Sequence, residues 1–186
     1  MLLVFWMLKF IFNLPSSPVA IFNPLHKTVY QDMTRPLNEY FIESSHNSYL
    51  EGDQLKSPSS TEAYKKILLS GCRCVELDLW DGPKNEPMIY HGYTLTPKVR
   101  AREVLEVISK YAFEASPYPV ILSLENHLSI GQQQVFVQYL QEIFAKNVIP
   151  THTSRFWESN PKQLPSPENL RGKILIKASS SFLCFF

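Results

Sequence analysis

The chain has 186 residues, of which 45% are hydrophobic and 13% aromatic, so it can bury a sizeable core and is not typical of a disordered protein. Its 18 lysine and arginine residues nearly balance its 17 aspartate and glutamate residues. No overall field therefore favours nucleic acid, and attraction to a membrane would have to be local. Three cysteines, Cys72, Cys74 and Cys184, are too few for a disulfide framework and lack the partner pair of a zinc site, so we expect a reducing, intracellular compartment.

The chain begins with an apolar run over residues 1–12 that is interrupted only by Lys9. A membrane-spanning helix needs about 20 apolar residues, so the run is too short to cross a bilayer. A signal peptide is the alternative, but no positive charge precedes the run, and the small residue Ala20 follows a poor cleavage context. We expect residues 1–28 to be an apolar segment and a linker.

From about Tyr40 onward, short apolar runs alternate with longer amphipathic ones, which is typical of a parallel α/β structure. The runs rich in Val, Ile, Leu and aromatic residues predict strands over residues 40–44, 73–79, 88–90, 120–124 and 173–177.

Helix signals lie between these strands. A capping-box pattern at residues 59–62 predicts a helix over residues 63–69, and Thr96 before Pro97 predicts the start of a second helix. Ser129 with Gln132 repeats the capping pattern for a third. The last two helices show apolar faces at helical spacing, formed by Val104, Leu105, Ile108 and Tyr111 and by Val135, Phe136, Tyr139, Leu140, Ile143 and Phe144.

Chemically active side chains follow or close the predicted strands. They are His46 and Asn47 after the first, Glu76 and Asp78 at the end of the second, His91 after the third, and Glu125 with Asn126 at the end of the fourth. Parallel α/β folds build their active sites at the carboxyl ends of their strands. We therefore expect these side chains to meet at one place.

Glu76 and Asp78 are two residues apart on a predicted strand, so their carboxylates point to the same face, about 6.5 Å apart. Two carboxylates aimed into a core repel each other unless a cation or a proton neutralises them. With Asn47 and Glu125 they form a set of hard oxygen ligands that suits Ca²⁺ or Mg²⁺ rather than zinc, and flexible geometry favours Ca²⁺. The alternative is that both carboxylates face water on an edge strand.

A single histidine is more often a hydrogen-bonded structural residue than a catalyst. His46 and His91 both lie at strand ends beside the expected cation, however, which favours acid–base work on a phosphate. A metal that polarises the phosphoryl group would complete such a site.

Four motifs carry a family resemblance: SHNSY at residues 45–49, GCRCVELDLWDG at 71–82, YHGYT at 90–94 and YPVILSLENH at 118–127. In this order and spacing they resemble the X region of eukaryotic phosphoinositide-specific phospholipase C, most closely the delta-type or sperm-type enzymes. The resemblance spans residues 29–177 and leaves residues 178–186 as a tail without family character. It implies the α/β fold of the X half of a TIM-type barrel, with about four parallel strands and helices outside.

The resemblance also implies a reaction, the hydrolysis of phosphatidylinositol 4,5-bisphosphate to diacylglycerol and inositol 1,4,5-trisphosphate in lipid signalling. It implies that Asn47, Glu76, Asp78 and Glu125 bind Ca²⁺. Carried over by motif, His46 would stabilise the transition state, His91 would act as general acid, Glu76 or Glu125 would be the general base, and Lys177 would contact the ring phosphates. A cytoplasmic protein that associates peripherally with membranes is the matching expectation.

The sequence also departs from the family pattern. The family places a second phosphate-binding lysine two positions after Lys177, where this chain has Ser179, and the Y half of the barrel does not follow. One alternative is therefore an inactive X-region fragment that acts only by pairing with another chain, such as a Y-region chain, as a binding or dominant-negative module. Another is a glycerophosphodiester phosphodiesterase, a barrel enzyme whose motifs differ from those quoted.

Overall fold

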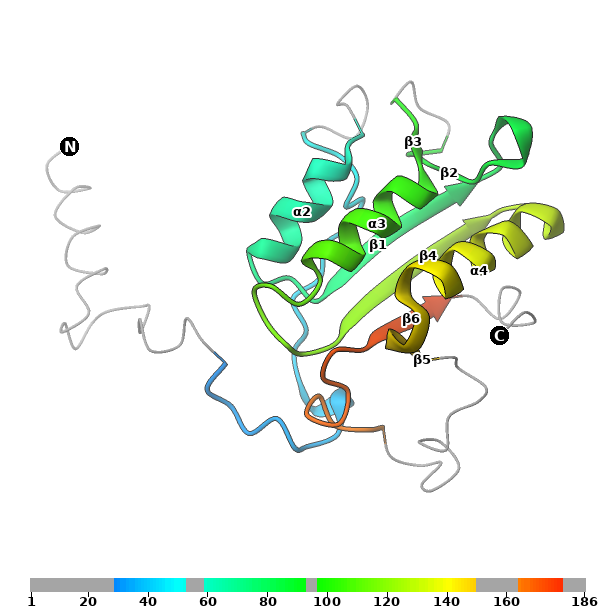
Figure 1. Cartoon of the computed structure of the whole chain (residues 1–186). Coiled ribbons are helices and arrows are strands. Elements are labelled where there is room, and N and C mark those ends of the chain that lie inside the picture. Colours follow the sequence, from blue (N-terminus) through cyan, green and yellow to red (C-terminus); the bar gives the residue numbers. More distant parts are fainter. Residues whose placement is uncertain (1–28, 53–58, 93–96, 150–163, 179–186) are drawn as a thin grey trace, which may run out of the picture. The chain divides into compact units, whose positions relative to one another are not determined.

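The computed structural model of the protein describes residues 29–52, 59–92, 97–149 and 164–178 (Figure 1). The chain divides into two compact units, Met1–Met33 and Thr34–Phe186, and all the helices and strands described below belong to the second. The expected apolar segment 1–28 lies outside the described residues.

The second unit is built on a six-stranded sheet in the order β3-β2-β1-β4-β6-β5. Its strands are β1 (Cys74–Trp80), β2 (Met88–Ile89), β3 (Val99–Arg100), β4 (Val120–His127), β5 (Val148–Ile149) and β6 (Ile174–Ala178). The strands β1, β4, β6 and β5 are parallel neighbours, whereas β2 and β3 run antiparallel at one edge. The expected α/β fold with four parallel strands is confirmed, as an open sheet consistent with part of a barrel.

Three helices lie on one face of this sheet (Figure 1). They are α2 (Thr61–Leu69), α3 (Ala101–Tyr111) and α4 (Ile130–Phe144), and short 3-10 turns occupy Leu37–Glu39, Pro83–Asn85 and Ala145–Asn147. Among the described residues, no helix is both long enough and apolar enough to cross a membrane.

The core lies between these helices and the sheet. Because successive side chains of a strand alternate between its two faces, Val75, Leu77 and Leu79 of β1 all point under the helices. Their partners are the buried residues Leu122 of β4, Ile174 of β6, Leu68 of α2, Leu105 and Ile108 of α3, and Phe136 and Leu140 of α4. The apolar faces predicted for the last two helices are therefore confirmed.

The first predicted strand, over residues 40–44, does not form. Only Ser44 makes a bridge, to Cys74 at the start of β1, and Phe41 is fully exposed. The segment forms backbone hydrogen bonds with the sheet only at Arg73 and Cys74, at the start of β1, and the turn at residues 45–49 then ends the pairing.

The strand predicted over residues 88–90 forms as β2, but it is antiparallel to β1 and not one of the parallel strands. A hairpin connection requires this, because the seven-residue segment between the paired residues Trp80 and Met88 is too short for a parallel crossover. After Trp80 the chain therefore turns back along β1, and this brings His91 to the site.

The helix starts also differ from the sequence signals. The N-cap of α2 is Ser60, whose side chain accepts from the Ala63 N–H, one residue later than the predicted pattern. Helix α3 begins at Ala101, after β3, so the start predicted at Pro97 is wrong. Ser129 precedes α4 without a side-chain cap, because its hydroxyl donates instead to Asp81 Oδ1 at 3.1 Å.

Arg73 joins the C-terminal ends of α2 and α3 to the sheet. Its guanidinium donates to backbone carbonyl oxygens at the ends of α2 and α3 and in the loop before β4, which belong to Leu68, Gly71, Cys72, Ala112, Ser116 and Tyr118 at 2.7–3.4 Å. These include carbonyls that the end of a helix leaves without an intrahelical donor. Burial lowers the pKa of Arg73, but the cost is offset by this set of acceptors.

We expect Arg73→Met to lower the free energy of unfolding by about 3 kcal/mol, because several part-buried carbonyl oxygens lose their donor. Urea denaturation of the full chain measures this loss. Arg73→Lys, which keeps the charge but has fewer donors in a different geometry, should give an intermediate value. A methionine variant as stable as the wild type would contradict the role assigned to this side chain.

Candidate active site

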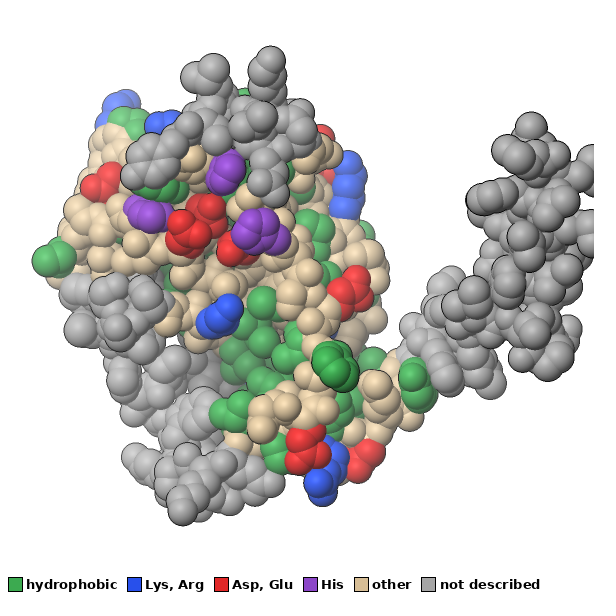
Figure 2. Space-filling view, turned by 180° about the vertical axis from the view of Figure 1, so that it is seen from behind, with side chains coloured by type: hydrophobic (Ala, Val, Ile, Leu, Met, Phe, Trp, Pro, Cys, Tyr) green, Lys and Arg blue, Asp and Glu red, His purple; other side chains and the backbone are tan. Residues whose placement is uncertain are grey.

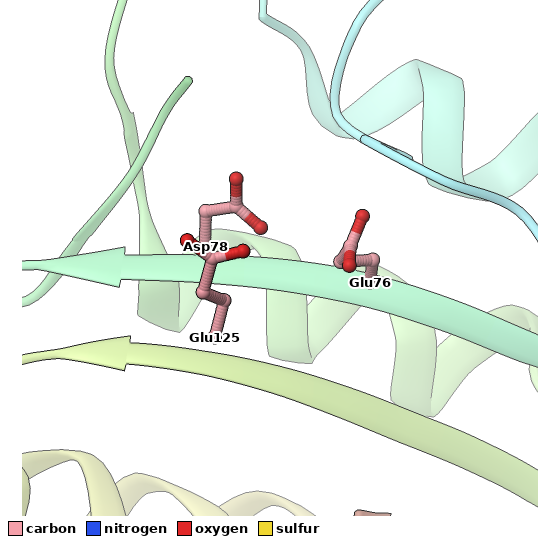
Figure 3. A group of neighbouring side chains, drawn as sticks. All are labelled: Glu76, Asp78 and Glu125. Atoms are coloured by element: carbon pink, nitrogen blue, oxygen red, sulfur yellow. The ribbon is translucent and has the colours of Figure 1, made fainter. Parts of the chain in front are cut away.

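The site lies on the face of the sheet opposite the helices. Figure 2 shows this face, where histidine side chains surround a group of acidic side chains and an apolar area lies next to them. The acidic group consists of Glu76 and Asp78 of β1 and Glu125 of β4. Figure 3 shows that all three project from the same side of the two strands.

The register of β1 and β4 brings the carboxylates together. Asp78 is paired with Glu125 and Glu76 with Ser123, so the three acidic residues share one face of two neighbouring strands. Each offers a carboxylate oxygen that lies within 4.8 Å of the others. Asp78 is buried, at 4% exposure, while Glu125 is exposed.

Burial raises the pKa of the Asp78 carboxyl to about 6. The hydrogen bond from Tyr49 opposes this, the charges of Glu125 and Glu76 raise the pKa further, and nearby His91 lowers it. The protein therefore places three acidic groups where they cannot all ionise without cost unless a positive charge joins them.

The turn at residues 45–49 closes over β1 and contacts two of the carboxylates. Asn47 has φ 47°, a left-handed conformation that asparagine tolerates better than most residues. Its backbone N–H donates to Glu76 Oε2 at 2.7 Å. The Tyr49 hydroxyl lies 2.7 Å from Asp78 Oδ2 and 3.0 Å from Asn47 Oδ1.

The same turn completes the free edge of β1. The Ser48 hydroxyl accepts from the Glu76 backbone N–H at 2.9 Å, and the buried Tyr64 hydroxyl of α2 donates to the Glu76 carbonyl oxygen at 2.7 Å. No strand pairs with β1 here among the described residues, so side chains satisfy the backbone groups that a strand would otherwise bind. This holds Glu76 in place.

The hydrogen bonds around Tyr49 test whether these residues suit a cation. A tyrosine hydroxyl has one proton, so it cannot donate fully to both Asp78 and Asn47, while Asn47 Nδ2 and Asp78 Oδ1 are buried without partners among the described residues. Turning the Asn47 amide by 180° lets Nδ2 donate to Tyr49, which then donates to Asp78. The amide oxygen and Asp78 Oδ1 then both lack a donor, and two such oxygens fit a hard cation such as Ca²⁺.

The two predicted histidines lie near the carboxylates. His46 is exposed, and its Nδ1 is 3.1 Å from Glu76 Oε2. His91 lies near enough to lower the pKa of Asp78, and the preceding residue, Tyr90, donates its N–H to the Asp78 carbonyl oxygen at 3.4 Å.

Lys177 lies on β6 in register with Ser123 of β4, which in turn is paired with Glu76. It is therefore level with Glu76 and two strands away, about 10 Å at the usual strand spacing. Its side chain is exposed. The structure thus places Lys177 in the same row as one carboxylate, at the margin of the group.

Sequence reasoning selected the carboxylates, Asn47 and both histidines, and the structure brings them together. It gave no role to Tyr49, which contacts Asp78, nor to His127, whose Nε2 lies 2.8 Å from Glu125 Oε1. Both residues lie within quoted motifs and two positions from a predicted ligand. That spacing on a strand or tight turn is the signal that could have found them.

Comparison with known proteins gives a consistent result. A family model described as "Phosphatidylinositol-specific phospholipase C, X domain" matches residues 33–180. The chain is 58% identical over 157 residues to 1-phosphatidylinositol 4,5-bisphosphate phosphodiesterase delta-3-A of Danio rerio, covering 84% of this chain and 20% of the relative. It is 52% identical over 168 residues to the delta-1 enzyme of Homo sapiens, covering 90% of this chain and 22% of that protein.

Solved structures agree on the fold. The crystal structure of L. pealei PLC21 superimposes with a TM-score of 0.75 at 41% identity and covers 91% of this chain but 22% of that one. A calcium-dependent phosphoinositol-specific phospholipase C from a Pseudomonas species superimposes with a TM-score of 0.60 at 15% identity, over 78% of this chain and 58% of that one. The second likeness concerns the fold alone.

The raised pKa of Asp78 predicts how stability depends on pH. The folded chain, with a pKa of about 6 against an ordinary value of 3.8, binds this proton more tightly than the unfolded chain. The contribution of Asp78 is therefore complete below the unfolded pKa and is lost as the pH rises through about 6, by up to about 3 kcal/mol.

In the presence of a chelator, Asp78→Asn should raise the melting temperature relative to wild type, and by more at about pH 7.5 than at about pH 5. Thermal unfolding at the two pH values measures this difference. The exposed carboxylate Glu103 of α3 supplies the control substitution Glu103→Gln. A gain for Asp78→Asn that is equal at both pH values would show that the Asp78 charge does not cause it.

Proposed function

Because this chain belongs to the phosphatidylinositol-specific phospholipase C X-domain family, we propose that it supplies the calcium-binding and acid–base half of a phosphoinositide phospholipase C active site. The substrate would be phosphatidylinositol 4,5-bisphosphate, which the names of both relatives specify. The products would be diacylglycerol and inositol 1,4,5-trisphosphate. The observation that carries the proposal is the group of three carboxylates within 4.8 Å, with His46 beside Glu76 and His91 near Asp78.

Asn47, Glu76, Asp78 and Glu125 would hold the calcium ion. All four offer oxygen ligands, and the two buried oxygens of Asn47 and Asp78 support this choice of metal. Bound there, Ca²⁺ would offset the negative charge of the phosphate and of the attacking inositol hydroxyl.

The histidines would move protons and stabilise charge. A protonated His46 that donates from Nδ1 to Glu76 keeps its Nε2–H for an equatorial phosphate oxygen. His91 would donate the proton that the diacylglycerol leaving group needs. Glu76 or Glu125 would accept the proton of the inositol 2-hydroxyl, and exposed Lys177 would pair with a ring phosphate.

The chain spans about a fifth of the length of the two curated relatives described above. On the site face, Cys74, Ile121 and Leu175 are only half-buried, whereas a closed barrel fills its interior with side chains. We therefore propose that turnover requires the remaining strands, as a Y region supplies them in the family. The same open face supports the second candidate, a binding module that pairs with a Y-region chain without turnover of its own.

The proposed setting is the cytoplasmic surface of a membrane, where the lipid headgroup is accessible. The described residues include no spanning helix, and the overall charge is close to neutral. Association would therefore rest on the headgroup contacts of the site and on local features of the surface.

Calcium binding provides a direct test. We expect the full chain to bind Ca²⁺ in isothermal titration calorimetry, and we expect Glu76→Gln to weaken binding by at least about tenfold, since a half-buried anionic oxygen is lost beside two other carboxylates. Glu103→Gln, at an exposed position on α3, is the matched control and should bind as the wild type does. Equal affinity of the wild type and Glu76→Gln would show that the ligand set is wrong.

Reconstitution tests the need for the rest of the barrel. The chain alone should release little inositol phosphate from phosphatidylinositol 4,5-bisphosphate vesicles with Ca²⁺, because catalytic groups displaced by about 1 Å lose on the order of a hundredfold in rate. Adding a separately expressed Y half of a relative should restore turnover, and His46→Ala should abolish it. Strong activity of the chain alone, lost in His46→Ala, would refute the requirement. A silent mixture of proven partners would favour the binding module.

A further inference from the structure

A stacked pair of rings lies beside Glu125, at the end of the site face. Trp80 closes β1 and His127 closes β4, and the register of the two strands places these residues opposite each other. Their ring centroids are 3.9 Å apart and their planes differ by 13°. The imidazole of His127 therefore lies flat on the indole of Trp80.

The free side of this imidazole contacts a predicted calcium ligand. His127 Nε2 is 2.8 Å from Glu125 Oε1, which is short enough for a charge-assisted hydrogen bond. An ionised carboxylate only accepts, so Nε2 must carry the proton. The two residues are two apart on β4 and hence on the same face, which explains how the ring reaches the carboxylate.

Glu125 differs from the other two carboxylates in how it is held. Glu76 binds the backbone N–H of Asn47 and Asp78 binds the Tyr49 hydroxyl, whereas among the described residues the side chain of Glu125 has its hydrogen bond with His127. The Glu125 side chain is 57% exposed, against 17% for Glu76. A long, exposed side chain samples many rotamers unless a fixed partner holds it.

Trp80 gives His127 such a fixed position. A Cβ at Gly92 would stand 2.2 Å from an atom of the Trp80 ring, so the backbone next to His91 packs directly against the indole. Tyr90 contacts the same ring, with centroids 5.5 Å apart. The indole thus contacts both the segment that carries His91 and the imidazole that contacts Glu125.

We propose that His127, seated on Trp80, is a positioning residue that holds the Glu125 carboxylate toward the calcium site. This inference rests on the proposed function, and it adds a residue that binds neither the metal nor the substrate. Most exposed ion pairs contribute little because two mobile side chains must be ordered together. Here the imidazole is already ordered by stacking, so only Glu125 loses freedom when the bond forms.

Terbium binding tests the effect on the metal site, with Tb³⁺ alone as the probe of the calcium site and emission followed by excitation of the aromatic residues. His127→Phe keeps a flat ring for Trp80 but removes the donor, and it should weaken Tb³⁺ affinity by about tenfold, the low end for partners of metal-binding side chains. His127→Gln restores a donor and should recover part of the loss. Arg171→Gln, which breaks the Arg171–Glu168 ion pair, is the control and should leave affinity unchanged.

The outcomes are separable. The proposal would be overturned by a His127→Phe variant that has the same melting temperature as the control variant and binds Tb³⁺ as tightly as the wild type. Equal losses in His127→Phe and His127→Gln would overturn it as well, because a restored donor would then have no value.

A second measurement on the metal-free chain decides the proposal even where a variant is unstable. With ¹⁵N-labelled histidine and a chelator present, the His127 ring should be protonated at Nε2, and its carbon-bound protons should be shifted upfield by the Trp80 ring. Glu125→Ala should alter the Nε2 signal. A neutral His127 protonated at Nδ1 alone would overturn the proposal. Failure of the wild type to bind Tb³⁺ would count against the proposed function, and this measurement would still test the contact between His127 and Glu125.

Discussion

The parallel pairing of β1 with β4 sets both the core and the site. Along seven paired residues, one face of the two strands carries Val75, Leu77 and Leu79 with their β4 neighbours, and these side chains pack under the helices. The other face carries the carboxylates, with Asp78 opposite Glu125. A slip by one residue would exchange the two faces of a strand, so the burial of the apolar row fixes where the charges lie.

The cost of this arrangement is the approach of three carboxylates to one another. Burial and the neighbouring carboxylates already raise the pKa of Asp78, and the hydrogen bond from Tyr49 only partly offsets them. Separating β1 from β4 would reduce the repulsion between the carboxylates, but the same pairing builds the core. The protein instead surrounds the carboxylates with donors and leaves the buried Asp78 Oδ1 without a donor among the described residues, as suits a cation ligand.

The edge of β1 that faces away from β4 is bound by turns and side chains, and these bring residues of the candidate site into place. The segment at residues 43–45 binds the backbone of Cys74, the side chains of Ser48 and Tyr64 bind the backbone of Glu76, and Tyr90 binds the carbonyl oxygen of Asp78. A full neighbouring strand would satisfy the same groups. Turns and side chains take its place here, and they bring the segments that carry His46 and His91 near the carboxylates. The hydrogen bonds of the β1 backbone and the arrangement of the candidate site therefore have the same origin.

The sequence by itself determined the family, the four motifs, the residues of the acidic group and the apolar faces of α3 and α4, because each depends on local spacing or on residue type. Tertiary structure alone decided that residues 40–44 make only one bridge to β1 and that α3 starts at Ala101, after β3, since both depend on pairing with another segment of the sheet. It also decided the roles of Tyr49 and His127. Their two-residue spacing from Asn47 and Glu125 places them near the predicted ligands, but only the folded chain shows that their polar atoms contact Asp78 and Glu125.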